Sequence, residues 1–290
     1  MRRWVDADLI LVNPSIPLED FLPPIDLAGP IHFIGGRDQN GLNTGTFFLR
    51  VSPWSVHFLN RAIGIPLYHP EIDLGNSFDQ VAMSRILATD QGYDESVEGA
   101  TNETLSERNK RLSGIVRPFV FQPREWYNAY EFDHGYEGGD DPHAGHLLVH
   151  FPGLEERRWP HMEKWLLELA NNQQDWDVAF KDSIYAGQIQ EYWGLVRQSR
   201  ALVKTANETL ADLSPSSSDY PRIRAAADLC EGPLTDSSYD IGPGQDLLER
   251  MKMGIAKLQD ALKPDSFSTG NTTGQDQMES LTDSPLTNDG

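Results

Sequence analysis

Two carboxylates one residue apart lie between two apolar runs near the start of the chain, and this arrangement constrains the fold more than any other feature. Trp4-Val5 precedes Asp6-Ala7-Asp8, and Leu9-Ile10-Leu11-Val12 follows. Short apolar runs bounded by polar residues are typical of buried strands. On extended backbone, residues i and i+2 point to the same side, so we expect Asp6 and Asp8 to face one point at the mouth of a sheet.

Two converging carboxylates offer the hard oxygen ligands that a divalent cation such as Mg²⁺ or Mn²⁺ prefers, and such a cation can hold a diphosphate. The alternative is a simple turn, because Asp favours turns through hydrogen bonds to its own backbone. A motif this short is common, so the metal hypothesis depends on what the rest of the chain supplies.

Composition limits the partners of this 290-residue chain. A formal net charge of −20 repels phosphate backbones and anionic lipids, which argues against nucleic acid or a membrane surface as the main partner. An anionic ligand would need a metal ion or a few Arg side chains. The single cysteine, Cys230, permits no internal disulfide and excludes a multi-cysteine zinc site. No apolar run reaches the roughly 18 residues of a transmembrane helix, and no signal-peptide pattern follows Met1.

Apolar patterning predicts an α/β domain over residues 1–170, a helical extension over 171–263 and a disordered tail over 264–290. The extension begins with a long helical pattern at residues 175–213, which carries aromatic residues at three- and four-residue spacing. Turn-forming residues dominate 38–45, and a Gly-, Asp- and His-rich loop is expected at 133–145. The expected strands are 31–34, 46–50, 119–121 and 147–149, and the expected helices are 53–63, 76–87, 159–170, 222–230 and 246–262.

A third ligand for the cation is expected from a histidine. His150 follows an apolar strand and precedes a Pro-Gly turn, where the polar end of a strand opens into a cleft. His143 and His146 lie nearer the Gly- and Asp-rich loop and stay open as alternatives. The non-functional interpretation of His150 is a histidine at the rim of the core whose hydrogen bonds are satisfied.

Two further segments are candidates for ligand binding. Asn43 and Gly45 precede an apolar strand, and they could meet sugar hydroxyls or form an ordinary turn. Asp79 and Gln80 open a helix whose first turn could line a cleft. Gln80 also lies three residues after Ser77, so it could simply complete a helix cap.

Arginines and aromatic residues complete the candidates. Arg124, Arg157 and Arg158 could supply positive charge to a phosphate, or could be ordinary surface residues. One aromatic group could stack on a sugar, although such stripes more often belong to a core. Its members are Trp126, Tyr127, Tyr130, Phe132 and Tyr136. The same two interpretations, sugar stacking or core packing, apply to Trp176, Tyr192 and Trp193.

The ordered set of motifs resembles glycosyltransferase family 34, which includes fungal galactosyl- and mannosyltransferases and is similar to plant xyloglucan xylosyltransferases. The set comprises W-V-D-A-D-L-I-L-V-N-P, then D-Q-N-G-L-N-T-G-T-F-F-L-R, then D-Q opening a helix, then H-F-P-G, and it covers roughly residues 4–166. The resemblance implies a GT-A-type, Rossmann-like fold and a Golgi location. It also implies the metal-dependent, retaining transfer of a hexose from UDP-galactose or GDP-mannose to a glycan or glycoprotein acceptor. A homo- or hetero-oligomer with related transferases stays open.

The resemblance also assigns roles to residues. Asp6, Asp8 and His150 look like the ligands of Mn²⁺ or Mg²⁺, and Asn43 and Gly45 look like the segment near the donor sugar. The pair Asp79 and Gln80 matches the residues beside the reacting carbon, where Gln80 would steady the positive charge while the leaving phosphate acts as base.

Two departures from the family pattern stand out. Plant members have Cys where this chain has Leu154, and a phosphate-binding Lys has no clear match, so Arg157 or Arg158 would substitute. The family's membrane anchor and first βα units would precede Trp4, so we expect a truncated GT-A domain.

Three functions follow as hypotheses. The first is the metal-dependent transferase. The second is a truncated, non-catalytic family member that acts as a binding or assembly partner, with the helix at 175–213 as its contact surface. The third is a metal-dependent hydrolase.

Overall fold

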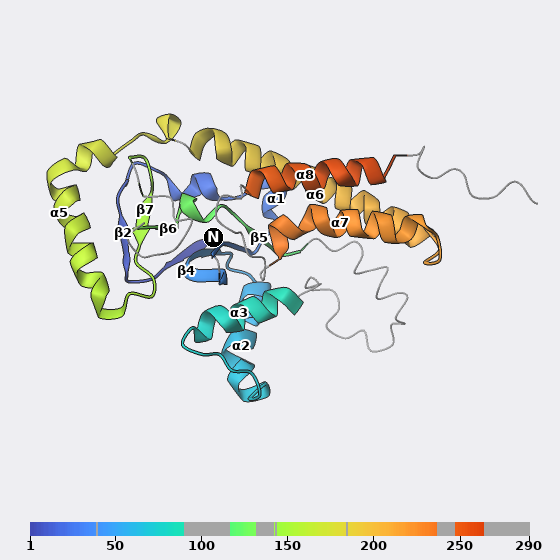
Figure 1. The fold of residues 1–290 in the computed structure, drawn as a ribbon, viewed down its shortest axis with the longest axis horizontal. Coiled ribbons are helices and arrows are strands. Elements are labelled where there is room, and N and C mark those ends of the chain that lie inside the picture. Colours follow the sequence, from blue (N-terminus) through green and yellow to red (C-terminus); the bar gives the residue numbers. More distant parts are fainter. Residues whose placement is uncertain are drawn as a thin grey trace, which may run out of the picture.

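The computed structural model describes residues 1–38, 40–89, 117–131, 142, 144–183, 185–236 and 247–263. The expected tail at 264–290 and most of the loop at 133–145 lie outside these ranges. Among the helices that are described, none is both long enough and apolar enough to cross a membrane. The architecture combines sheets and helices, so the predicted α/β class is confirmed (Figure 1).

The larger sheet has four strands in the order β1-β4-β3-β5. β1 pairs antiparallel with β4, β4 pairs antiparallel with β3, and β3 pairs parallel with β5. β1 forms one edge of this sheet. The bounds are β1 (Arg2–Val5), β4 (Gly41–Leu49), β3 (Phe33–Asp38) and β5 (Phe119–Phe121).

The smaller sheet has three short strands in the order β2-β7-β6. β2 (Leu9–Leu11) pairs antiparallel with β7 (Leu148–His150), and β7 pairs parallel with β6 (Ala129–Tyr130). The chain passes from the edge of the first sheet to the edge of the second through residues 6–8. The two predicted metal ligands of the D-A-D motif therefore lie at the junction of the two sheets.

Two helices cover one face of the larger sheet (Figure 1). α2 (Pro53–Tyr68) begins as predicted, since Ser52 accepts a hydrogen bond from the Ser55 backbone N–H and Pro53 occupies the first helical position. α3 (Phe78–Thr89) follows and packs beside it. The core between these helices and the sheet is aromatic and aliphatic, with Phe33, Phe47, Phe121, Trp54, Phe58, Met83 and Leu87 among its members.

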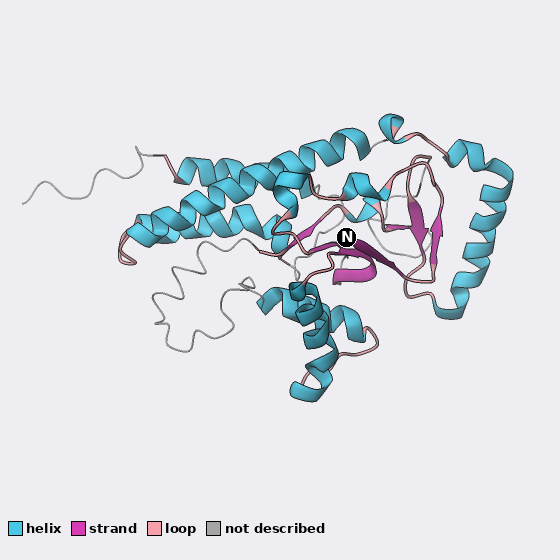
Figure 2. Ribbon diagram, turned by 180° about the vertical axis from the view of Figure 1, so that it is seen from behind, coloured by secondary structure: helices cyan, strands magenta, loops and turns pink. Residues whose placement is uncertain are grey.

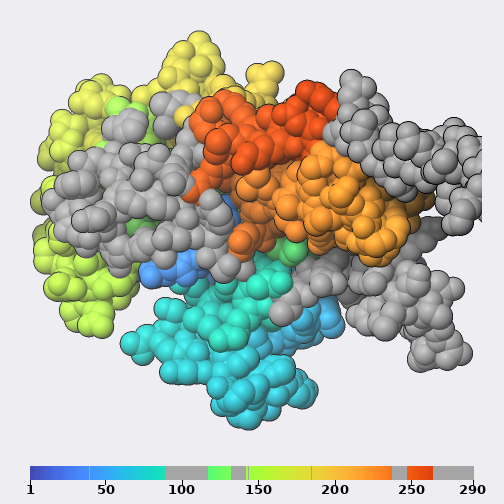
Figure 3. Space-filling model, turned by 45° about the vertical axis from the view of Figure 1, so that its right-hand side comes forward, coloured from blue at the N-terminus to red at the C-terminus, as the bar shows by residue number. Residues whose placement is uncertain are grey.

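Three helices form the C-terminal part of the described chain: α6 (Tyr185–Asp212), α7 (Asp219–Thr235) and α8 (Leu247–Ala261). Figure 3 shows α7 and α8 lying side by side on one face of the molecule. The aromatic stripe of α6 faces inward, because Tyr185, Tyr192 and Trp193 share a core cluster with Phe21 and Trp126. The stripe therefore belongs to the core, the alternative given for Tyr192 and Trp193, and these rings are not available to a partner on the contact surface that the second hypothesis places on this helix.

α5 (Arg158–Trp176) lies along the outside of the smaller sheet (Figure 2). Trp165 and Leu169 of this helix are buried against Ile10 and Val149 of the strands. The other elements within the described residues are short: α1 (Ile25–Ala28) and 3-10 helices at Leu18–Phe21, Arg124–Trp126, Glu155–Arg157 and Phe180–Asp182.

Two local boundaries differ from the predictions. The turn-forming residues expected over 38–45 are strand from Gly41 on, because Gly41–Gly45 already belong to β4, and Gly41 has a φ of 95°. The helix expected from 175 begins only at Tyr185, because α5 continues to Trp176 and a 3-10 helix intervenes. The main core cluster draws on residues from both sides of residue 170, and the division into domains stays a prediction.

Candidate metal-binding site

The D-A-D motif forms the turn between β1 and β2 rather than extended backbone. The backbone N–H of Asp6 donates to the carbonyl of Gly45 at 2.8 Å, which ties this end of the turn to β4. The carbonyl of Asp8 accepts from the N–H of Phe151 at 3.0 Å, which ties the other end to the residue after β7. The backbone of the turn is thus attached to one sheet at Asp6 and to the other at Asp8, and the two carboxylates remain close to each other.

His150 completes the group at the end of β7. Its backbone lies opposite Leu9 in the pairing of β2 with β7, and its Nε2 lies 3.4 Å from Oδ1 of Asp8. One ligand atom from each of Asp6, Asp8 and His150 lies within 4.8 Å of the others. We call these three residues the junction cluster. Ligands on opposite sides of a divalent cation at oxygen-ligand distances are about 4–5 Å apart, so the cluster has suitable dimensions for one ion.

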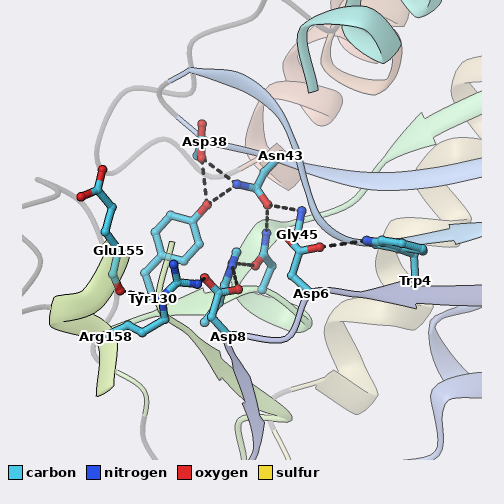
Figure 4. Close-up of polar contacts among 11 residues, drawn as sticks. Trp4, Asp6, Asp8, Asp38, Asn43, Gly45, Tyr130, Glu155 and Arg158 are labelled. Atoms are coloured by element: carbon cyan, nitrogen blue, oxygen red, sulfur yellow. Dashed lines mark hydrogen bonds and ion pairs between the residues drawn. The ribbon is translucent and has the colours of Figure 1, made fainter. Parts of the chain in front are cut away.

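Arg158 contributes a positively charged side chain to this site. Its Nη1 donates to Oδ2 of Asp8 at 2.9 Å, while its Nε donates to the carbonyl of Glu155 (Figure 4). Burial alone would raise the pKa of Asp8. When its ring is protonated, His150 donates a hydrogen bond from Nε2 to Asp8 and adds a positive charge. Together with Arg158, this outweighs the effect of burial and holds the pKa of Asp8 below its usual value. Asp8 is therefore a ready anionic ligand at neutral pH.

The second carboxylate of the junction cluster is less well compensated. Partial burial raises the pKa of Asp6, and the nearby carboxylates of Asp8 and Asp79 act in the same direction. The indole N–H of Trp4, 2.9 Å from Oδ1 of Asp6, and the charge of His150 only partly oppose this (Figure 4). A bound cation would offset both the burial of Asp6 and the repulsion from Asp8 and Asp79.

A chain of buried amides lies behind His150. Nδ1 of His150 is 2.7 Å from Oδ1 of Asn128, and Nδ2 of Asn128 donates to Oδ1 of Asn43 at 2.8 Å. The same Oδ1 accepts from the backbone N–H of Gly45 at 2.9 Å. On its other side, Nδ2 of Asn43 donates to Asp38 and to the hydroxyl of Tyr130 (Figure 4). The Asn43 amide is thus fully engaged inside the protein.

Gly45 leaves room for the histidine ring. A Cβ built at this position would lie 2.3 Å from Cε1 and 3.0 Å from Nδ1 of His150. His150 is only 2% exposed, so the ring has little freedom to move aside. The close approach that a glycine permits here is therefore an approach of the imidazole to β4.

The other predicted site residues lie around the cluster in different ways. Asp79 is exposed and Gln80 is half-buried in the first turn of α3, and Asp79 is near enough to Asp6 to affect its pKa. Arg157 is exposed at the end of its 3-10 helix, and its neighbour Arg158 is the arginine that contacts the carboxylates. Arg157 as a donor-binding residue stays a prediction.

The competing histidines and aromatic residues separate clearly. His146 is 1% exposed and lies against the ring of Tyr185, outside the junction cluster, and His143 lies outside the described residues. The aromatic side chains that precede the loop belong to the core where they are described, and Phe132 and Tyr136 lie outside the described residues. The buried members are Trp126, Tyr127 and Tyr130.

Sequence reasoning missed three contacts of the site. Asn128 had no motif to mark it, although it is a polar residue directly before a strand of aromatic and small residues. Trp4 was taken only as an apolar strand residue, yet its indole N–H reaches Asp6. Arg158 was considered for a phosphate but not as the partner of Asp8.

Comparison with known proteins finds an α-1,2-galactosyltransferase of Schizosaccharomyces pombe. It is 30% identical to this chain over 143 residues, which make up 48% of this chain and 30% of the relative. The match spans less than a third of the relative's length, so it indicates distant kinship with a glycosyltransferase and does not establish the family. No family model matches the sequence. No solved structure matches it either.

Proposed function

We propose that this chain belongs to a metal-dependent glycosyltransferase that moves a hexose from a nucleotide-sugar to a glycan acceptor. The junction cluster carries this proposal, because two carboxylates and an imidazole converge within 4.8 Å at the meeting point of two sheets. The kinship with an α-1,2-galactosyltransferase supports glycosyl transfer as the reaction class. A site for a divalent cation is what the diphosphate of a nucleotide-sugar donor requires in a strongly acidic protein.

The ligand set fits Mn²⁺ or Mg²⁺. Hard carboxylate oxygens with one imidazole suit these ions, and thiolate ligands that would favour zinc are absent from the described cluster. When bound, the ion supplies Lewis-acid neutralisation of the leaving diphosphate. The chain contributes Asp6, Asp8 and His150 as ligands, and each is held by backbone or side-chain contacts of its own.

Other residues would act on the substrate. Arg158 already holds one oxygen of Asp8, and its half-buried guanidinium lies where a phosphate oxygen beside the cluster would meet it. Asp79 lies at the start of α3, near enough to Asp6 to affect its pKa, and Gln80 follows it in the same helical turn. We assign Gln80 the role of steadying the positive anomeric carbon, with the leaving phosphate as the base for the incoming hydroxyl, in a retaining transfer.

Several finer features complete the proposal. The donor would be UDP-galactose or GDP-mannose, the fold would be of the GT-A type, and the location would be the Golgi. Association with related transferases would supply further contacts. These features follow from the resemblance of the motifs rather than from any contact of the described residues.

The decisive experiment measures binding before transfer. Isothermal titration of the purified chain with Mn²⁺, then with UDP or GDP in the presence of Mn²⁺, should give saturable binding of each, and labelled UDP-galactose or GDP-mannose should then label a glycan acceptor. If neither nucleotide binds with Mn²⁺ present, the proposal fails for this chain. Glu131→Gln serves as a matched control, because it removes a buried carboxylate outside the cluster.

The same assay separates the two competing functions. A non-catalytic binding partner would bind Mn²⁺ and nucleotide without transferring sugar under any acceptor condition. A hydrolase would release free sugar at the same rate with and without acceptor. A transferase requires that acceptor increase the loss of donor and that Asp8→Asn abolish that increase.

A further inference from the structure

The amide chain behind the junction cluster determines which nitrogen of His150 is available to a metal. We infer that Asn128 is a positioning residue that holds His150 in the Nδ1–H tautomer, with the lone pair of Nε2 directed toward Asp8. This inference rests on the proposed metal-binding function of the cluster, but the tautomer itself can be measured without any metal.

The orientation of the first amide is fixed by the backbone. The N–H of Gly45 can only donate, so the atom of Asn43 that lies 2.9 Å from it must be the oxygen Oδ1. The opposite end of the amide faces Oδ2 of Asp38 at 3.1 Å, which as a carboxylate oxygen only accepts. Reversing the amide would place donor against donor at one end and acceptor against acceptor at the other.

The second amide then follows from the first. Because Oδ1 of Asn43 accepts, the Asn128 atom 2.8 Å away must be the nitrogen Nδ2. The oxygen of Asn128 is thereby turned toward His150, 2.7 Å from Nδ1. Asn128 is fully buried, so water cannot replace either partner without a cost.

The consequence falls on the histidine. An amide oxygen only accepts, so Nδ1 of His150 must carry a hydrogen, and a neutral ring has its lone pair on Nε2. That nitrogen lies 3.4 Å from Oδ1 of Asp8. While the ring is neutral, these two electron-rich atoms repel each other unless a cation lies beside both, whereas a protonated ring carries a hydrogen on both nitrogens and cannot bind a metal. The amide chain thus leaves the neutral imidazole in the form that can bind a metal. In many metal sites, the ligating histidine likewise donates its other ring N–H to an oxygen atom that fixes its orientation.

The inference predicts what happens when the hydrogen-bonded chain of amides is interrupted at Asn128. In Asn128→Leu, an apolar side chain of similar size, Nδ1 loses its acceptor, and the carboxylates on the Nε2 side, Asp8 first, become the acceptors near the ring. His150 should then place its hydrogen on Nε2, in the position that a metal would occupy. We expect Mn²⁺ binding to weaken by about 10- to 100-fold, the range typical for the loss of such an orienting contact.

Nitrogen NMR of the histidines tests the tautomer directly. Long-range ¹H–¹⁵N spectra of metal-free protein labelled at histidine, at a pH at which the ring is neutral, should show Nδ1–H for His150, identified by its loss in His150→Gln. Asn128→Leu should shift this residue to Nε2–H and should weaken Mn²⁺ binding in titration. The inference is overturned if His150 is Nε2–H in the unaltered protein, or if Asn128→Leu leaves its tautomer unchanged.

Asn13→Leu is the matched control. Asn13 is an equally buried asparagine beyond the far end of β2, where its amide donates to the carbonyl of Val178. It should lose stability as Asn128→Leu does, without changing the His150 tautomer. If it changed the tautomer to the same degree, the effect would be general loosening and the inference would fail. Absence of Mn²⁺ binding in the unaltered protein would instead contradict the proposed function, since the tautomer is read without metal.

Discussion

Two regions of this protein combine the same types of side chain, one as a candidate metal site and the other as a structural contact. The junction cluster has an imidazole from His150, a cationic neighbour in Arg158 and an indole N–H from Trp4. The second region, which we call the Glu131 cluster, consists of one carboxylate and three side chains of α5. In it, the Glu131 carboxylate accepts from Nδ1 of His161 at 2.7 Å, Nζ of Lys164 at 3.1 Å and Nε1 of Trp165 at 2.9 Å.

The difference lies in the ratio of carboxylates to donors. Glu131 is one buried carboxylate with three donors from one face of α5, so its charge and lone pairs are satisfied within the protein. The junction cluster has two carboxylates, with Asp79 nearby, and the amide of Asn128 occupies one nitrogen of its histidine. The three donors let Glu131 link the residue after β6 to α5. The extra carboxylate of the junction cluster instead favours a bound cation.

The largest expected effect comes from removing a carboxylate of the junction cluster. Asp8→Asn should weaken Mn²⁺ binding by more than about 100-fold, because it removes a metal ligand rather than a residue that orients one. Titration calorimetry measures the change. In Glu131→Gln the Mn²⁺ affinity should stay as in the unaltered protein, and equal losses in both variants would erase the distinction between the two regions.

The next effect comes from filling the space beneath His150. Gly45→Ala should displace the ring, lower Mn²⁺ affinity about 10- to 100-fold and cost about 1–3 kcal/mol of stability through overpacking. Urea denaturation and Mn²⁺ titration measure the two effects. Gly194→Ala is the control, since a Cβ there meets nothing within 4 Å and should stabilise α6 by about 0.5–1 kcal/mol. Undiminished Mn²⁺ affinity in Gly45→Ala would mean that the ring position is unimportant.

The Glu131 cluster should respond in stability rather than in metal binding. Burial alone would raise the pKa of Glu131, but hydrogen bonds from Lys164, Trp165 and His161 outweigh it and hold the pKa below the usual value. The contribution of Glu131 to stability is therefore present above the unfolded-state pKa of about 4.3 and is lost as pH falls through the lower folded-state value.

Glu131→Gln should accordingly cost about 1–2 kcal/mol at pH 7. The difference from the unaltered protein should shrink as pH falls below about 4, provided that both proteins remain folded. Urea denaturation at a series of pH values measures it. Glu163→Gln, at an exposed position of the same helix, should change little at any pH. If the difference in unfolding free energy did not change with pH, the ionised carboxylate of Glu131 would not be the source of this stabilisation.

The smallest expected effect has the opposite sign. Arg158 shares Asp8 with any bound cation, so Arg158→Gln should tighten the binding of Mn²⁺ alone by a few-fold, the scale of a partly exposed ion pair. Binding of UDP or GDP in the presence of Mn²⁺ should weaken in the same variant, because a phosphate loses its guanidinium. Lys164→Gln should change neither titration. Weaker binding of Mn²⁺ alone in Arg158→Gln would show that the arginine organises the carboxylates instead of competing with the ion.

Part of the site could be predicted because it depends on short-range patterning. Asp6 and Asp8 follow one apolar strand and His150 ends another, and polar residues at strand ends tend to meet at the edge of a sheet. The turn conformation was not needed for that prediction, since turn and strand both bring the two carboxylates to one side. The first part of β4 was missed because Asn and Gly are frequent in loops, whereas Asn43 and Gly45 are buried within this strand.

The sequence alone determined which ligand types were available and roughly where along the chain they stood, because apolar periodicity and strand ends are local properties of the backbone. The tertiary structure decided which donors meet which carboxylates. Asn128 reaches Asn43 across 85 positions and Arg158 reaches Asp8 across 150. A hydrogen bond acts only over about 3 Å, so these pairings depend on how two sheets and a helix are placed, which no local pattern contains.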